Sequence, residues 1–260
     1  MQIYQVNLTK QKLAAMHQLE RTLLLLLGHA RNEINVLSKL ILMAGNSRLP
    51  PHQIVDHVEA AQTLIIMQVL IGKLHEAWEL FKRRVQSNSH FSSKYLLKLS
   101  PKGAAAHEEL NRRFRKGSVL TKIRNKISFY YRDEDNLIDD SFQRLADTEP
   151  WEFYLSKTRG NTFYYASELV ITKSAIQLVN NQVGIEASDL HNQAFKGLCD
   201  IVIRVSDQIG TLFDECIAVM VTEAMEGVAE PTAVDIGEVP KRLSASLPFF
   251  FNEEDLSAGS

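Results

Sequence analysis

The sequence predicts a mainly α protein, a helical bundle with long antiparallel helices and a small β-hairpin insertion. Three long stretches, residues 7–44, 51–86 and 187–225, carry apolar side chains at helical spacing. The composition, 45% hydrophobic and 23% charged, is typical of a globular chain that can bury a sizeable core. These two observations set the fold class before any single residue is considered.

The ends of the first two helices are marked by capping residues. Asn7 and Thr9 can cap the first helix, and Gly45-Asn46 suits its C-terminal end. The connector over residues 47–51 is short, and Pro51 fits the first turn of the second helix. Because the connector is short, we expect the two helices to be antiparallel neighbours.

Shorter elements are expected between residues 100 and 172. Ser100-Pro101 begins a third helix that ends at Gly117, and Ser118 can cap a fourth. Asp133–Asn136 can cap a short fifth helix that is expected to run to about Leu145. Residues 150–172 are aromatic and β-branched on either side of Gly160, which predicts a β-hairpin.

Composition separates a body from a tail. Residues 1–228 are expected to form a single helical domain. Residues 229–260 are rich in Pro, Ser and acidic residues, which predicts a mobile or docked tail. Leu247–Phe251 is the exception, because an exposed run of three Phe is unfavourable in water. We expect this segment to dock on the body, on a second protomer or on a partner protein.

Charge, cysteines and apolar runs point to a cytoplasmic protein. The net charge of −2 gives no overall attraction to nucleic acid or to anionic lipid. Leu23–Gly28 and Leu64–Gly72 are far shorter than the roughly 20 residues of a membrane span, so no membrane contact is expected. Without a secretory signal, Cys199 and Cys216 are expected to be free thiols rather than a disulfide.

Motifs for metal, cofactor or nucleophilic chemistry were not found. The sequence has no phosphate loop, no Cys pair at zinc spacing and no serine-nucleophile motif. His52 and His57 are five positions apart, which does not place them on one helical face. We therefore expect no metal and no cofactor, and the sequence favours a protein that is not an enzyme.

Polar residues interrupt the apolar first helix. Arg31, Asn32, Glu33 and Asn35 lie among residues expected to be buried. A buried charge needs a partner, such as Glu76 on the second helix or a later acidic residue. The cluster is interpreted either as a structural ion-pair network or as the polar wall of a functional cleft.

A basic run begins in the third helix and continues into the fourth. Residues 111–132 contain eight basic side chains and no acidic ones, whereas residues 133–140 contain five acidic ones. Such a surface either is a solvated face or attracts phosphate. On the fourth helix, Leu120, Ile123, Ile127 and Tyr130 form the core stripe, while Arg124 and Tyr131 lie on the adjacent face.

Residues 123–131, IRNKISFYY, resemble the signature of the HEPN superfamily (higher eukaryotes and prokaryotes nucleotide-binding domains). That signature is an Arg, often followed by Asn, then four to six residues and a His. Arg124, Asn125, Lys126 and Phe129 match it, but the His position is occupied by Tyr130. The resemblance implies an α-helical, often dimeric protein of the kind that includes many RNases of defence and toxin–antitoxin systems.

The substitution of the His decides what the resemblance implies about activity. His exchanges a proton near neutral pH, whereas Tyr, with a pKa of about 10, does not. We therefore expect a catalytically weak or silent homodimer that binds RNA or a partner. Its nucleic-acid-binding residues would be Lys122, Arg124, Asn125, Lys126 and Tyr131, with Arg112, Arg113 and Arg115 from the basic run.

Two alternatives remain open. The first is a helical protein–protein interaction module that has no nucleic-acid role and uses Leu247–Phe251. The second is an active, metal-independent RNase in which Arg124 acts with Tyr130.

Overall fold

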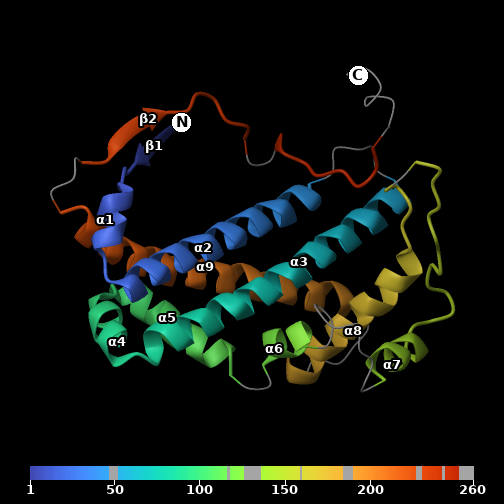
Figure 1. Ribbon diagram of the computed structural model, residues 1–260. Coiled ribbons are helices and arrows are strands. Elements are labelled where there is room, and N and C mark those ends of the chain that lie inside the picture. Colours follow the sequence, from blue (N-terminus) through green and yellow to red (C-terminus); the bar gives the residue numbers. More distant parts are fainter. Residues whose placement is uncertain are drawn as a thin grey trace. The chain divides into compact units, whose positions relative to one another are not determined.

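The computed structural model describes residues 1–46, 52–115, 118–125, 136–158, 160–183, 190–226, 230–241 and 244–251 (Figure 1). The elements in these ranges are, in chain order, β1 (Gln2–Gln5), α1 (Lys10–Ala15), α2 (Gln18–Ala44), α3 (Gln53–Phe81), α4 (Ser89–Tyr95), α5 (Pro101–Arg113), α6 (Val119–Ile123), α7 (Leu137–Gln143), α8 (Tyr165–Val183), α9 (Leu190–Ala224) and β2 (Thr232–Asp235). The predicted mainly α fold class is confirmed.

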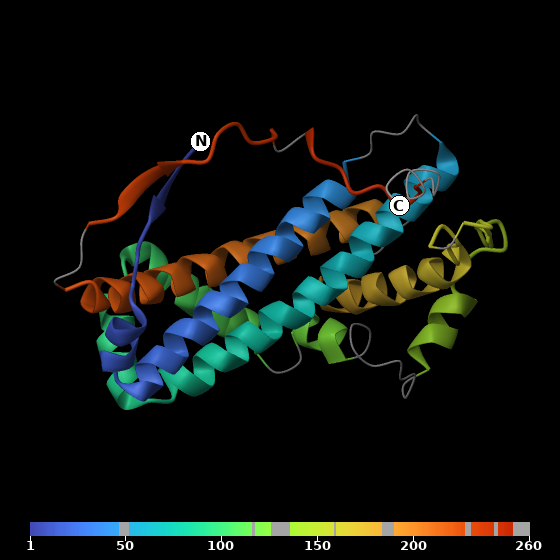
Figure 2. The same ribbon diagram turned by 45° about the horizontal axis from the view of Figure 1, so that its top comes forward.

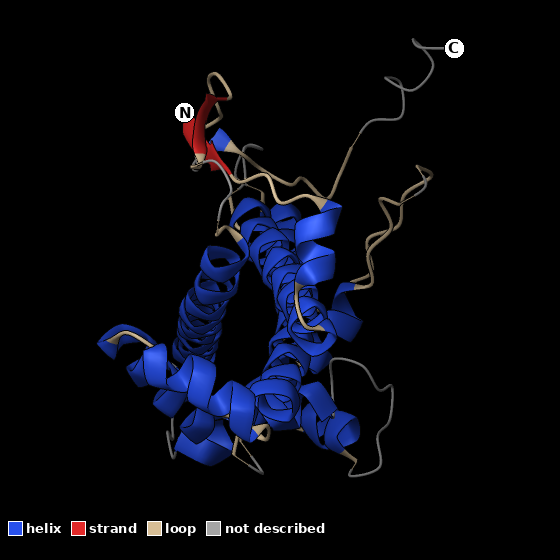
Figure 3. Ribbon diagram, turned by 60° about the vertical axis from the view of Figure 1, so that its left-hand side comes forward, coloured by secondary structure: helices blue, strands red, loops and turns tan. Residues whose placement is uncertain are grey.

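The strands come from the two ends of the described chain. β1 and β2 pair antiparallel, with Gln2 opposite Asp235 and Gln5 opposite Thr232 (Figures 2 and 3). Between residues 150 and 172, where the sequence predicted a hairpin, Tyr154 and Phe163 form an isolated antiparallel bridge. The two strands that form the sheet are therefore far apart in the sequence.

Residues 165–172 are helical, so the part of the predicted hairpin that fell on them is wrong. These residues begin α8, in which Ala166, Leu169 and Val170 are buried. Their spacing of three and four is that of a helix face. Packing of this face outweighs the β-branched character of Val170 and its neighbours.

Capping residues set several helix starts as predicted. The Thr9 side chain accepts a hydrogen bond from the Lys12 N–H in α1, and Ser100 and Ser118 cap α5 and α6 in the same way. The first helix is broken, however, because Met16 is extended and separates α1 from α2. α3 continues as a π-helix over Lys82–Gln86.

The chain folds into two compact units. Unit 1 consists of Met1–Val36, Lys73–Arg115 and Arg204–Ser244, and unit 2 of Leu37–Gly72, Lys116–Ile203 and Ala245–Ser260. The helices α2, α3 and α9 each contribute residues to both units. The tail predicted from residue 229 is likewise shared, because β2 belongs to unit 1 and residues 245–251 belong to unit 2.

An aromatic core holds unit 1 together. Trp78 of α3 is 1% exposed and stacks between Phe81 and Phe114, with ring centroids 5.8 Å from each. Phe81 stacks in turn on Phe213 of α9. Lys73 of α3 reaches Glu33 of the antiparallel α2 at 2.6 Å. Aromatic pairs of this geometry add to the free energy gained by burying their area.

Unit 2 has a hydrophobic cluster of its own. Val58, Ala61 and Phe163 are buried together, and Tyr154 and Tyr165 pack against them. The buried hydroxyl of Ser174 on α8 donates a hydrogen bond to the Ser141 hydroxyl on α7 at 2.9 Å. The polar groups between these two helices are thus satisfied by each other.

Both cysteines lie on α9 and are free thiols. Cys216 is buried, whereas Cys199 is half-buried. Burial, together with the nearby Glu215 carboxylate, raises the pKa of Cys216 to about 12.

Candidate functional site

The described part of the HEPN-like signature lies at the end of α6. Leu120 and Ile123 are buried, as the predicted core stripe requires, and they fix the orientation of the helix. Arg124 follows directly in helical conformation, and its Nη1 donates a hydrogen bond to Oδ1 of Asn125 at 2.9 Å. The second residue of the signature therefore orients the guanidinium of the first.

Arg124 is less open to solvent than the sequence suggested. It was expected to look away from the core, yet its side chain is half-buried and its Nε atom is buried. The neighbouring Asn125 is exposed. Lys126, Phe129, Tyr130 and Tyr131 lie outside the described residues, so the pairing of Arg124 with Tyr130 stays a prediction.

Two arginines of the basic run are already paired with a carboxylate. On α5, Arg113 Nε lies 2.6 Å from Glu109 Oε1, and Arg112 Nε lies 2.7 Å from Glu109 Oε2. Burial by itself would raise the pKa of Glu109, but the hydrogen bonds from both arginines outweigh it and hold this pKa below its usual value. Glu109 thus neutralises part of the positive charge of the basic run, which the sequence suggested could bind phosphate.

The residues predicted to bind nucleic acid are divided between the two units. Arg112, Arg113 and Arg115 belong to unit 1, whereas Lys122, Arg124 and Asn125 belong to unit 2. Arg115 is exposed and Lys122 is half-buried. The candidate nucleic-acid surface of unit 2 therefore centres on Lys122, Arg124 and Asn125.

The polar residues of α2 form two separate ion pairs within unit 1. Arg31 donates from Nε and Nη2 to both carboxylate oxygens of Asp214 on α9, each at 3.0 Å, and also binds Asn35. A later acidic residue, Asp214, is thus a partner of Arg31. Glu33 pairs instead with Lys73 of α3.

The remaining members of the predicted polar cluster, Asn32 and Glu76, are exposed. The ion pairs of Arg31 and Glu33 join α2 to α9 and to α3. A bidentate Arg–carboxylate pair has good geometry for such a bridge. This arrangement has the form of a structural network within unit 1.

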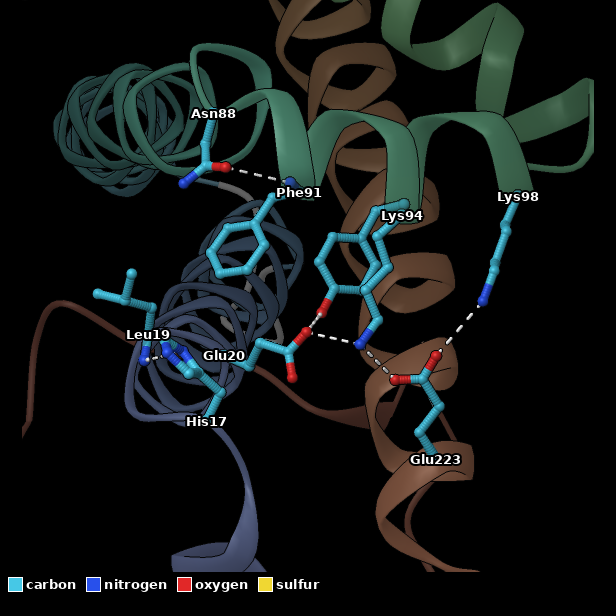
Figure 4. A network of polar contacts seen from close by, with 9 residues as sticks. His17, Leu19, Glu20, Asn88, Phe91, Lys94, Lys98 and Glu223 are labelled. Atoms are coloured by element: carbon cyan, nitrogen blue, oxygen red, sulfur yellow. Dashed lines mark hydrogen bonds and ion pairs between the residues drawn. The ribbon is translucent and has the colours of Figure 1, made fainter.

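The strongest polar cluster in unit 1 was not anticipated from the sequence (Figure 4). Lys94 of α4 lies between two carboxylates, 2.6 Å from Glu20 Oε1 and 2.7 Å from Glu223 Oε2. The Tyr95 hydroxyl donates to the same Glu20 oxygen at 3.1 Å, and Lys98 approaches Glu223 at 3.3 Å. Glu20 and Lys94 are 74 residues apart, so no local spacing signals their contact.

The pKa shifts in this cluster follow from its contacts. Burial would lower the pKa of Lys94, but hydrogen bonds to Glu20 and Glu223 outweigh it and raise this pKa. Burial would raise the pKa of Glu223, but Lys94 and Lys98 hold it below its usual value. Lys94 and Glu223 therefore keep their charges over a wider pH range than usual, which suits an ion-pair clamp rather than a proton-transfer site.

Unit 2 contains a second polar chain that sequence reasoning missed. The Tyr154 hydroxyl donates to Glu152 Oε2 at 2.5 Å and lies 2.9 Å from His57 Nδ1, while the His57 ring stacks on Tyr165 with centroids 4.4 Å apart. Burial and the Glu152 carboxylate raise the pKa of Tyr154. Its phenol therefore stays protonated at neutral pH and serves as a hydrogen-bond donor.

Metal ligands and the hydropathy of α3 also bear on the kind of site. No group of three His, Cys, Asp or Glu residues within the described ranges is arranged to hold a metal ion. Gln53–Gln86 has the length and hydropathy of a membrane span, properties that it shares with core helices of soluble proteins. Leu64, Leu70 and Leu74 of this helix are buried within the protein.

Comparisons with protein-family models, with curated proteins and with solved structures found no match for this chain.

Proposed function

We propose that this protein is a HEPN-like helical protein that binds RNA through the end of α6 and cleaves it weakly or not at all. The observation that carries the proposal is the Arg124–Asn125 hydrogen bond, which orients the signature arginine at 2.9 Å from its neighbour. A planar guanidinium held in one orientation suits bidentate contact with a phosphate. The mainly α architecture is the one that the resemblance implies.

Binding without cleavage follows from the residue at the His position. Tyr130 can stack on a base or donate a hydrogen bond, but it is a poor proton acceptor at neutral pH. Cleavage of the RNA backbone requires such an acceptor. The homodimer and the defence context that the resemblance implies stay predictions.

A second candidate function is a helical protein–protein interaction module with no nucleic-acid role. The pairing of Arg112 and Arg113 with Glu109 favours it, because this pairing reduces the positive potential of the basic run. An active, metal-independent RNase is the third reading. The same experiment separates all three.

The test is the binding of a fluorescent single-stranded RNA, followed by anisotropy at about 50 mM and about 200 mM salt. We expect Kd to rise with salt, and we expect Arg124→Ala to raise it about tenfold, because one charge-assisted hydrogen bond is lost. Arg112→Ala is the matched control. Arg112 lies in the same basic run but is held by Glu109, so its loss should change Kd much less.

Gel analysis of the same mixtures reports cleavage. RNA that is bound but intact supports the proposal. Cleavage that Arg124→Ala abolishes would instead establish the active RNase. An absence of RNA binding at both salt concentrations would favour the protein–protein interaction module.

A further inference from the structure

The C-terminal segment 245–251 lies on unit 2 and forms neither a helix nor a strand. We call it the docked segment. Its backbone is held by hydrogen bonds at Ala245 and at Leu247. Asn46 Nδ2 donates to the Ala245 carbonyl at 2.8 Å, and the Leu247 N–H donates to the Met43 carbonyl at 3.0 Å. These bonds recognise main chain and not side chains, so they would accept any residue at position 245 and any residue except proline at position 247.

One asparagine recognises the far end of the docked segment. Asn161 Nδ2 donates to the Phe251 carbonyl at 2.7 Å, and the Phe251 N–H donates back to Asn161 Oδ1 at 3.3 Å. Asn161 is itself buried, and it follows Gly160, whose φ of 87° favours glycine. A paired donor and acceptor of this kind reproduces the pairing of one strand residue with another.

Two phenylalanine rings give the docked segment its side-chain contacts. Phe249 meets the edge of Phe163 with ring centroids 5.0 Å apart, and Phe250 packs against the same cluster. The surface beneath them is made by Val58, Ala61 and Phe163, with Tyr154 at its border. We call this surface the aromatic face.

The docked segment is held less completely than the surface beneath it. Val58, Ala61 and Phe163 are buried, whereas Phe249 and Phe250 are only half-buried and Phe251 is 55% exposed. A side chain of the permanent core would be covered on all sides. Main-chain hydrogen bonds and a few side-chain contacts are features by which proteins recognise peptides in trans.

We propose that the aromatic face is a peptide-binding site. Its ligand is a segment of a partner protein that carries two adjacent phenylalanines. The docked segment, with Pro248, Phe249 and Phe250, is the resident occupant in cis. A tethered occupant has a high effective concentration, so the site is closed in the isolated chain and opens when a partner competes for it. The inference does not depend on RNA binding.

The test uses a fluorescent synthetic peptide with the sequence of residues 244–251, SASLPFFF. In the full chain, Phe249→Ala with Phe250→Ala weakens the resident occupant and leaves the aromatic face intact. We expect this double variant to bind the peptide at least tenfold more tightly than wild type, because the competition in cis is lost. A peptide with Ala at the positions of Phe249 and Phe250 is the control.

Adding Asn161→Ala to the double variant removes both hydrogen bonds to the peptide backbone at its last residue. We expect the peptide Kd to rise about tenfold relative to the double variant. Circular dichroism checks that each variant keeps its helix content. Equal peptide binding by wild type and the double variant, or no binding by either, would show that the docked segment is a permanent part of the fold.

A second measurement uses the unaltered protein. Lys241 is exposed and precedes the docked segment, so trypsin cleavage there reports how firmly that segment is held. Excess SASLPFFF should speed this cleavage, and the Ala-substituted peptide should not. An unchanged rate would overturn the proposal. A wild-type dimer that the double variant no longer forms would do so as well, because it would make a second copy the occupant.

Discussion

Gly103, in the first turn of α5, lies next to a side chain of another helix, α9. Glu215 of α9 accepts hydrogen bonds from the backbone N–H of Ser100 at 2.8 Å and from its hydroxyl at 2.6 Å. A Cβ at Gly103 would lie 2.2 Å from the Glu215 carboxylate. The glycine thus leaves room for an acidic side chain at the helix N-terminus, where negative charge is favourable.

Gly103→Ala should therefore destabilise the protein, although Ala favours helix. We expect the free energy of unfolding to fall by about 1–2 kcal/mol, the usual loss when a helix cap is disrupted. Gly28→Ala in α2 is the matched control, because a Cβ there would meet no atom of the described residues within 4 Å beyond its own helical turn, and it should stabilise by up to about 1 kcal/mol. Urea unfolding measures both, and a Gly103→Ala variant as stable as wild type would contradict the reading.

At the residue scale, the sequence predicted which side chains require an interaction partner better than it predicted which residue that partner is. The charge of Arg31 inside an apolar helix required a carboxylate, and a later acidic residue supplies it. Which of the later acids that was could not be read from the sequence, because Asp214 is 183 positions away. The same holds for Glu215, which carries no local signal of its contact with Ser100.

At the scale of elements, the short helix α4 depends on its clamp. A helix of seven residues is unstable alone and needs tertiary contacts. Lys94 supplies them by pairing with Glu20 of α2 and Glu223 of α9. Phe91 and Tyr95 of the same helix are buried.

Lys94→Met tests this clamp. It removes the shared cation and leaves two carboxylates facing each other, one of them, Glu20, with a side chain only 14% exposed. We expect the free energy of unfolding to fall by about 2 kcal/mol. Lys98→Met is the control, because Lys98 is largely exposed and its pairing with Glu223 should contribute less than about 0.5 kcal/mol. Equal losses for the two variants would rule out the clamp.

Element starts were easier to predict than element types. Thr9, Ser100 and Ser118 cap helices as the sequence indicated, because a cap is a local hydrogen bond. The break at Met16 carries no glycine or proline signal, and it was missed. Residues 165–172 were assigned to a strand by composition, although their buried positions repeat at helical spacing.

At the scale of the whole molecule, three helices link the folding of the two units. Because α2, α3 and α9 each supply residues to both, neither unit can lose its helices without shortening a helix of the other. Each unit also carries one tryptophan. Trp78 is buried in unit 1, and Trp151 contacts Phe142 in unit 2.

We expect a single cooperative unfolding transition. In Trp151→Phe, fluorescence reports Trp78 and unit 1, and in Trp78→Phe it reports Trp151 and unit 2. Each fluorescence curve in urea should coincide with the circular dichroism curve of the same variant, which controls for any loss of stability caused by the substitution. Separate midpoints in either variant would mean that the units unfold independently.

The buried thiol of Cys216 on α9 can report local unfolding of unit 1 through its reaction with an alkylating reagent. An alkylating reagent attacks thiolate, and a thiol that is 1% exposed with a pKa of about 12 offers almost none while the fold is closed. Its labelling rate under native conditions therefore measures how often unit 1 opens. The half-buried Cys199 gives the same chemistry a second position on the same helix, in unit 2. The rate of cysteine alkylation in the wild-type chain can thus be followed by mass spectrometry with no introduced probe.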